Sequence, residues 1–169
     1  MDFPAHVHIN GRTLDDYPPE FFVFSQPVIL EIKLSSSRYI TAADLDIEKI
    51  STGADLLLLK TDIAYGGDEY WRDNPGLDTT AAELLKNLPK PPRCLGLDFI
   101  SINRWPDREP GRIAHKVLLA EPEIIIIEDM DLSPLNEFGA RLRRVAAVPF
   151  RVAGVDGTPV TVMAELEFI

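Results

Sequence analysis

Two short, uninterrupted runs of branched apolar residues restrict the fold of this chain most: Leu56–Leu59 and Ile124–Ile127. A strand with one face in solvent alternates apolar and polar residues, whereas these runs have no polar face. Such a run suits a short central strand with cover both above and below. A helical pattern lies between the two runs. Together these patterns predict an α/β fold whose sheet is buried on both faces.

The remaining elements follow from periodicity, helix caps and chain breakers. Strands are predicted at residues 28–34, 55–61, 93–100, 124–127, 143–152 and 160–168. Helices are predicted from an N-cap at Thr41 to a stop at Gly53, over residues 81–88 after a capping box that starts at Thr80, and over residues 112–120. No linker, repeat or low-complexity tract interrupts the pattern, so one domain is expected over residues 1–169.

Composition and charge exclude several classes of partner. The chain has a net charge of −10 and 46% hydrophobic residues, which describes an acidic globular protein. Nucleic acids and anionic membrane surfaces require a basic patch, so neither is an expected partner. Cys94 is the one cysteine, so no internal disulfide forms and a reducing compartment is favoured. No basic region followed by an apolar run marks a signal peptide, and a cytoplasmic location is expected.

The segment from Asp2 to His6 carries the first chemical signal. It places a carboxylate and an imidazole four positions apart, with Pro4 between them. Proline fixes its own φ and favours an extended residue before it, so this segment is stiff. A rigidly held carboxylate and imidazole suit a metal site or an acid–base pair. The same pattern also occurs in loops that have no chemical role.

Two residues further along the chain join this signal. His115 lies on a predicted helix, and Glu128 follows the run of four isoleucines directly. An ionised carboxylate at the end of a buried strand is costly unless a positive charge meets it, and a metal ion would do so. The alternative is that Glu128 turns into solvent and His115 lies on an exposed helix face. Residue types alone favour that alternative.

Residues 62–78 form a segment rich in aromatic residues and glycine. Tyr70, Trp71 and Arg72 are the residues that we expect to contact a ligand, through a ring and a carboxylate partner, if the segment is a lid or a pocket wall. The alternative, weighted equally, is that the aromatic residues anchor a long loop to the core.

The stretch Asp2-Phe3-Pro4-Ala5-His6 resembles the end of the H-x-x-x-H-x-D-x-P-x-H motif of the cyclase family of metal-dependent hydrolases, which includes arylformamidases. The similarity continues through residues 11–18, 96–101, 114–119, 126–129, 148–152 and 156–160. Each piece is short, but their combination is specific and covers essentially the whole chain.

This resemblance implies a swivelling β/β/α domain, with a mixed sheet and barrel-like strands flanked by helices. It also implies a homodimer or larger assembly, a divalent metal (zinc or manganese) and hydrolysis of a small N-acyl or cyclic amide. Carried over by position, the metal ligands would be Asp2, His115 and Glu128, with His6 and Glu128 as the catalytic residues. Metal-activated water would then attack the carbonyl carbon, and His6 would transfer a proton to the leaving nitrogen.

The sequence departs from the family pattern at its beginning. The two histidines that precede the aspartate of the motif have no counterpart, because Asp2 follows Met1 directly. The expectation is therefore a cyclase-like domain without the N-terminal strands of the family, and an enzyme if the missing ligands exist in the native protein. The alternative is an inactive, truncated family member that acts as a structural or ligand-binding subunit.

Overall fold

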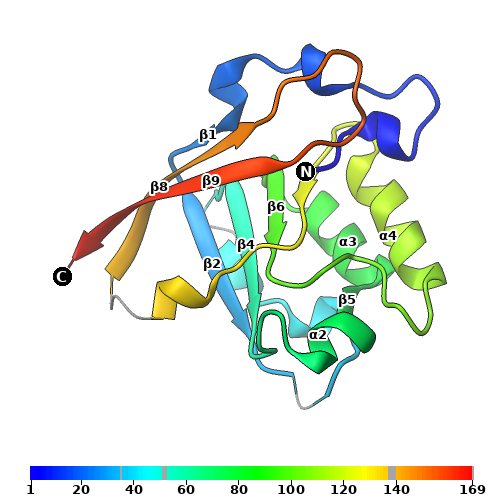
Figure 1. Ribbon diagram of the computed structural model, residues 1–169, viewed down its shortest axis with the longest axis vertical. Helices are drawn as coiled ribbons and strands as arrows, with labels where there is room; N and C mark the ends of the chain where they lie inside the picture. Colours follow the sequence, from blue (N-terminus) through cyan, green and yellow to red (C-terminus); the bar gives the residue numbers. More distant parts are fainter. Residues whose placement is uncertain (35, 51–52, 137–139, 169) are drawn as a thin grey trace.

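A parallel sheet of four strands forms the centre of the structure (Figure 1). The computed structural model describes residues 1–34, 36–50, 53–136 and 140–168. The strands of this sheet are β2 (Pro27–Ile32), β4 (Leu56–Thr61), β6 (Cys94–Leu97) and β7 (Ile125–Ile127), in that spatial order. Each strand therefore lies beside the next one along the chain, which is the arrangement that right-handed crossovers through helices produce.

The two apolar runs are buried on both faces of this sheet, as predicted. Leu57 and Leu59 of β4 belong to a core that the sheet shares with the helices. Leu56 and Leu58 point to the opposite face and pack in a second core with β1 and β8. Because successive side chains of a strand point to opposite faces, a strand between two cores has no position for a polar residue. This explains the four consecutive leucines.

Helices cover the first face of the parallel sheet. They are α1 (Ile47–Ile50), α3 (Thr79–Lys86) and α4 (Glu109–Leu119), and α3 packs beside α4 (Figure 1). Ala81, Ala82 and Leu85 of α3 are fully buried, and so are Ala114 and Leu118 of α4. Their spacing of three and four residues gives each helix one apolar side, which faces the sheet.

An antiparallel sheet covers the second face. It consists of β1 (Val23–Phe24), β8 (Ala140–Pro149) and β9 (Val160–Phe168), in the order β1-β8-β9. A third sheet pairs β3 (Tyr39–Ile40) with β5 (Gly76–Leu77). The α/β class is thus confirmed, with parallel and antiparallel strands in separate hydrogen-bonded sheets. Short 3-10 helices complete the chain at Pro4–His6, Leu14–Asp16, Pro19–Phe22, Ala42–Asp44 and Ser133–Asn136.

Three local predictions need correction. The helix expected from Thr41 to Gly53 is divided into the 3-10 helix Ala42–Asp44 and α1, and residues 51–52 lie outside the described part. Asp44 bonds back to Thr41, which completes a capping box on the short 3-10 turn. Asp78, and not Thr80, caps α3, because its carboxylate accepts a hydrogen bond from the backbone N–H of Ala81.

The third correction concerns residues 62–78, which do not form a continuous loop. They contain α2 (Asp68–Arg72) and β5.

Among the described residues, no helix is long and apolar enough to cross a membrane.

Candidate metal centre

The first residues of the chain lie against the last strand of the parallel sheet. The backbone N–H of Asp2 donates a hydrogen bond to the carbonyl of Ile126 at 2.8 Å, and Asp2 also forms a bridge with Gly157. Phe3 is fully buried, and its ring lies 5.4 Å from that of Tyr17. These contacts fix the carboxylate of Asp2 beside β7, close to the point where that strand ends.

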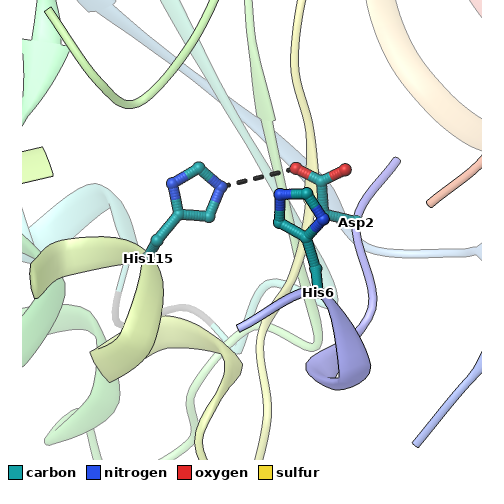
Figure 2. A group of neighbouring side chains, drawn as sticks. All are labelled: Asp2, His6 and His115. Atoms are coloured by element: carbon teal, nitrogen blue, oxygen red, sulfur yellow. Dashed lines mark hydrogen bonds and ion pairs between the residues drawn. The ribbon is translucent and has the colours of Figure 1, made fainter. Parts of the chain in front are cut away.

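The 3-10 helix Pro4–His6 turns the chain back after Phe3. Pro4 stands at its first position, where the missing N–H is not needed, and the His6 N–H bonds to the Phe3 carbonyl at 2.9 Å. This single turn brings the imidazole of His6 to the same side as the Asp2 carboxylate (Figure 2). Nδ1 of His6 also lies 3.6 Å from Oδ2 of Asp156.

His115 reaches the same point from α4. Its side chain is only 5% exposed, and Nε2 lies 3.4 Å from Oδ2 of Asp2 and 3.6 Å from Oε1 of Glu128. One ligand atom each from Asp2, His6 and His115 lies within 4.8 Å of the other two (Figure 2). The structure thus brings together the four residues that the sequence predicts as metal ligands or as the proton-transfer group. Asp2, His6 and His115 form the cluster, and Glu128 joins it through its contact with His115.

Glu128 is held in place by the loop that follows β6. Its Oε1 atom accepts hydrogen bonds from the backbone N–H of Ile102 at 2.7 Å and from the Ser101 hydroxyl at 3.1 Å. Gly111 of α4 allows this loop to approach, because a Cβ at that position would lie 2.6 Å from the Ile102 carbonyl oxygen. The carboxylate of Glu128 therefore has a fixed direction toward His115.

The two carboxylates of the site have opposite pKa shifts. Burial raises the pKa of Glu128, and the negative charge of Asp2 adds to this rise, which the charge of His115 and the two hydrogen bonds do not offset. Burial also acts to raise the pKa of Asp2, but the hydrogen bond with His115 and nearby positive charges lower it below its usual value. A half-buried group of two carboxylates and two imidazoles of this kind would gain from a cation.

A cavity of about 540 Å³ opens beside these residues. His6 and His115 lie on its wall, together with Asn103, Glu109, Arg112 and Lys116. A volume of this size is typical of sites that bind small molecules. His6 and His115 thus face a space that a small ligand can enter from the side where α4 begins.

The residues 70–72 that were expected to contact a ligand do not act together. Tyr70 is fully buried and donates a hydrogen bond to the carboxylate of Asp129, so it does not face a ligand. Arg72 is exposed and lines neither of the two cavities near the site. Trp71 lines a second cavity, which adjoins the first. The helix α2 separates the three side chains, since consecutive helical residues point in different directions.

Several residues near the site had no assigned role from the sequence. Ser101 and Ile102 orient Glu128, and Asp156 lies beside His6. Ser101 follows a predicted strand directly, where open α/β sheets place ligands, so its position was a usable signal. Asp156 belongs to the turn between the C-terminal strands, and no pattern in the sequence links that turn to His6.

Comparisons with known proteins identify the family and the fold. Residues 1–104 match the model of the Cyclase family, described as "Putative cyclase". No curated protein matches the sequence.

Among solved structures, a potential metal-dependent hydrolase with cyclase activity superposes with a TM-score of 0.72 at 24% identity, over 96% of this chain and 75% of the other. Isatin hydrolase A from Labrenzia aggregata gives a TM-score of 0.70 at 20% identity, over 99% and 72%. The fold is therefore shared with these proteins, and since the family model spans more than half of its residues, this chain belongs to the cyclase family.

Proposed function

We propose that this protein is a metal-dependent hydrolase of small-molecule amides, with Asp2, His115 and Glu128 as metal ligands. The observation that carries the proposal is the convergence of Asp2, His6 and His115 within 4.8 Å, although α4 and the first residues are more than 100 positions apart. Glu128 completes the group at 3.6 Å from His115. A group of carboxylates and imidazoles around a buried histidine, with a strongly perturbed carboxyl among them, is a candidate functional site.

The donor atoms fit a divalent transition metal. Two carboxylates and one imidazole, from Asp2, Glu128 and His115, form a ligand set that zinc and manganese both accept. Burial raises the pKa of Glu128 by more than the charge of His115 and the hydrogen bonds lower it, so a divalent cation beside this carboxylate would stabilise its ionised form. When bound, such a metal would polarise a carbonyl group and make a water molecule more acidic.

The side chains of the chain itself have separate tasks in this proposal. His6 is 44% exposed at the cavity wall, so its imidazole can both reach a ligand and exchange protons with solvent. It would transfer a proton to the leaving nitrogen of the amide, and Asp156, 3.6 Å from Nδ1, would orient the ring. Ser101 and Ile102 hold Glu128, the second catalytic residue, in one direction.

The similar structures support this choice of reaction. One of them is described as a potential metal-dependent hydrolase with cyclase activity, and another is an isatin hydrolase. Isatin is a cyclic amide, and the arylformamidase resemblance points to N-acyl amides. A small aromatic amide is thus the proposed substrate, and a homodimer in the cytoplasm is the proposed state of the protein.

The test is metal content and turnover of the purified chain. After incubation with zinc or manganese and dialysis, the wild type should retain metal and hydrolyse isatin or N-formylkynurenine. Asp2→Asn and His115→Asn should lose both properties. His8→Asn is the matched control, because His8 is the third histidine of the chain and bonds to the Lys116 carbonyl outside the cluster. Retention of metal by both cluster variants would reject the site, and bound metal without turnover would favour the inactive alternative.

A further inference from the structure

A second cavity, of about 360 Å³, adjoins the cavity beside the candidate metal centre. Asn103 and Arg112 line both cavities, so they mark the place where the two meet. Ser101 lines the second cavity as well, and its hydroxyl group donates a hydrogen bond to Glu128. The second cavity is therefore a neighbour of the cavity beside the candidate metal centre, with Asn103 and Arg112 between them.

The second cavity is basic although the protein is acidic. The chain has 27 acidic and 17 basic residues, yet the described residues of the cavity wall include Arg108 and Arg112 and no aspartate or glutamate. Within the described residues, no salt bridge involves either arginine. Two guanidinium groups without a carboxylate partner favour an anion in the space between them.

Aromatic rings supply the other part of the wall. The chain has two tryptophans, and both Trp71 and Trp105 line this cavity. They are 56% and 66% exposed, which is unusual for the largest apolar side chain. The guanidinium of Arg108 lies 4.2 Å from the centre of the Trp105 ring. Exposed indole rings beside arginine are suited to stack against a planar ligand.

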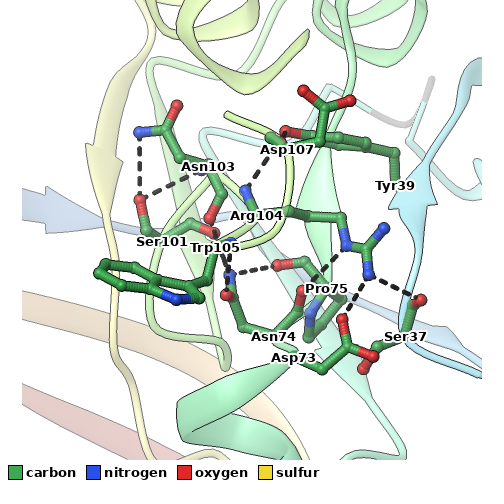
Figure 3. A network of polar contacts seen from close by, with 10 residues as sticks. All are labelled: Ser37, Tyr39, Asp73, Asn74, Pro75, Ser101, Asn103, Arg104, Trp105 and Asp107. Atoms are coloured by element: carbon green, nitrogen blue, oxygen red, sulfur yellow. Dashed lines mark hydrogen bonds and ion pairs between the residues drawn. The ribbon is translucent and has the colours of Figure 1, made fainter. Parts of the chain in front are cut away.

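Hydrogen bonds from buried Asn74 hold part of the backbone of this wall in place. Asn74 is 1% exposed, and its side-chain amide donates a hydrogen bond to the Asn103 backbone carbonyl at 2.8 Å and accepts one from the backbone N–H of Trp105 at 3.1 Å (Figure 3). Arg104 bonds in turn to the Asn74 carbonyl at 3.2 Å. A site whose backbone is fixed in advance loses less entropy when it binds a ligand.

We propose that this second cavity binds a planar, carboxylate-bearing aromatic group of the substrate. The carboxylate would pair with Arg112 and Arg108, and the ring would stack against Trp71 and Trp105. This assignment rests on the proposed function and narrows the substrate to aromatic amides that carry an anionic group. Arg112, at the junction of the two cavities, would set the distance from that anionic group to the scissile amide.

Binding of benzoate and of its uncharged analogue benzamide tests this proposal. Both tryptophans of the chain lie at the cavity, so their fluorescence reports occupancy directly. Titrations use the full chain in EDTA at low salt, where no metal contributes. Benzoate should change the tryptophan fluorescence saturably, and benzamide should bind about tenfold more weakly, because a charge-assisted hydrogen bond contributes on the order of a tenfold factor in affinity. Equal binding of both compounds, or no binding of benzoate, would overturn the proposal.

Arginine variants show which residues produce the preference for benzoate, and calorimetry measures the dissociation constant of each variant. Arg112→Gln should weaken benzoate binding about tenfold, and the double variant with Arg108→Gln should abolish the preference over benzamide. Arg112→Lys keeps the charge and should retain part of the affinity. Arg144→Gln is the matched control, since Arg144 is exposed on β8 and lines neither cavity. Unchanged benzoate affinity in the double variant would refute the proposal that the second cavity binds the carboxylate.

The two proposals can fail separately. Benzoate binding in EDTA does not depend on Asp2, His115 or turnover. Metal binding without a preference for benzoate would therefore reject the carboxylate-binding role of the second cavity and leave the proposed hydrolase untouched. A benzoate preference in a protein that binds no metal would reject the hydrolase and leave an anion-binding cavity.

Discussion

Nε2 of His115 lies 3.4 Å from Oδ2 of Asp2, although 113 positions separate the two residues. The contact joins α4 to a segment that is held at the edge of β7 by backbone hydrogen bonds. Neither residue could reach the other if the first residues were free in solution. The integrity of the candidate metal centre therefore depends on contacts that fasten the N-terminal segment to the rest of the molecule.

The first prediction separates proton transfer from metal binding. His6→Gln should keep the metal content of the wild type but lower kcat about 100-fold or more, because general acid–base catalysis contributes on this scale. Metal analysis and steady-state kinetics on the same preparation measure both quantities. His6 also lies within ligand distance of Asp2 and His115. A parallel loss of metal would assign it to the ligand set instead.

The second prediction concerns Glu128. Burial raises the pKa of this carboxyl, so its ionised form destabilises the metal-free fold above that pKa. Glu128→Gln can still accept hydrogen bonds from Ile102 and Ser101. At pH 8 we expect the metal-free variant to be more stable by about 1 kcal/mol and to bind zinc more weakly. Urea unfolding in EDTA and zinc titration measure the two effects, and a less stable metal-free variant would contradict the argument.

The third prediction tests the attachment of the N-terminal segment. Arg12 bonds to Glu123 at 2.6 Å, and the Glu123 side chain is only 6% exposed. Arg12→Gln leaves Glu123 with the Tyr17 hydroxyl and with the charge of Lys86, which lies outside ion-pair distance. We expect a loss of about 1–2 kcal/mol in the free energy of unfolding, below the usual cost for a buried pair because Arg12 is partly in solvent.

The control for this variant is another arginine in an ion pair. Arg143 lies 3.2 Å from Glu167, and both side chains are about half exposed. Arg143→Gln should therefore change the unfolding free energy by less than about 0.5 kcal/mol. Similar losses in both variants would show that burial of Glu123 does not decide the cost.

The fourth prediction concerns Gly111. In an ordinary helix a change from glycine to alanine stabilises by up to about 1 kcal/mol. Here the added Cβ would lie 2.6 Å from the Ile102 carbonyl oxygen and 2.7 Å from Cα of Asn103. Gly111→Ala should therefore destabilise the fold by about 1–3 kcal/mol, and should weaken zinc binding because Ile102 orients Glu128. Thermal unfolding and zinc titration measure these effects, and a stabilised variant would disprove the close packing.

The fifth prediction concerns pH. Burial raises the pKa of Asp98 to about 6, although its carboxylate accepts two hydrogen bonds from Thr61. Between the unfolded value of 3.8 and about 6 the folded state binds more protons, so this group lowers stability as pH rises through that range. An asparagine can accept the hydrogen bond from the Thr61 N–H with its oxygen and donate one to the Thr61 hydroxyl with its amide nitrogen, so both contacts remain and one reverses direction. The free energy of unfolding of Asp98→Asn, relative to that of the wild type, should therefore increase by about 2 kcal/mol as the pH rises from 4 to 7.

Chemical denaturation of both proteins at a series of pH values measures this gain. The comparison between the two proteins removes the contribution of all other titrating groups. A stability difference that does not vary with pH would show that Asp98 titrates normally.

The strands illustrate what local pattern can predict. The two apolar runs form β4 and β7 with both faces buried, and the C-terminal strands form the pair β8–β9. The segment at residues 62–78 illustrates the limit. Its glycines and aromatic residues indicate a loop, yet Tyr70 is buried in α2 and bonds to Asp129. The local pattern does not show which partner a ring will find.

The sequence by itself determined the α/β class, the buried strands and the residue types of the candidate metal centre, because hydrophobic periodicity and short motifs are local properties. It also supported the family assignment. Only the tertiary structure decided that Asp2, His6, His115 and Glu128 meet, and that Trp105, Arg108 and Arg112 line a cavity beside them. The physical reason is that a site depends on contacts between distant segments, which the packing of helices and strands around two cores sets and which no local pattern encodes.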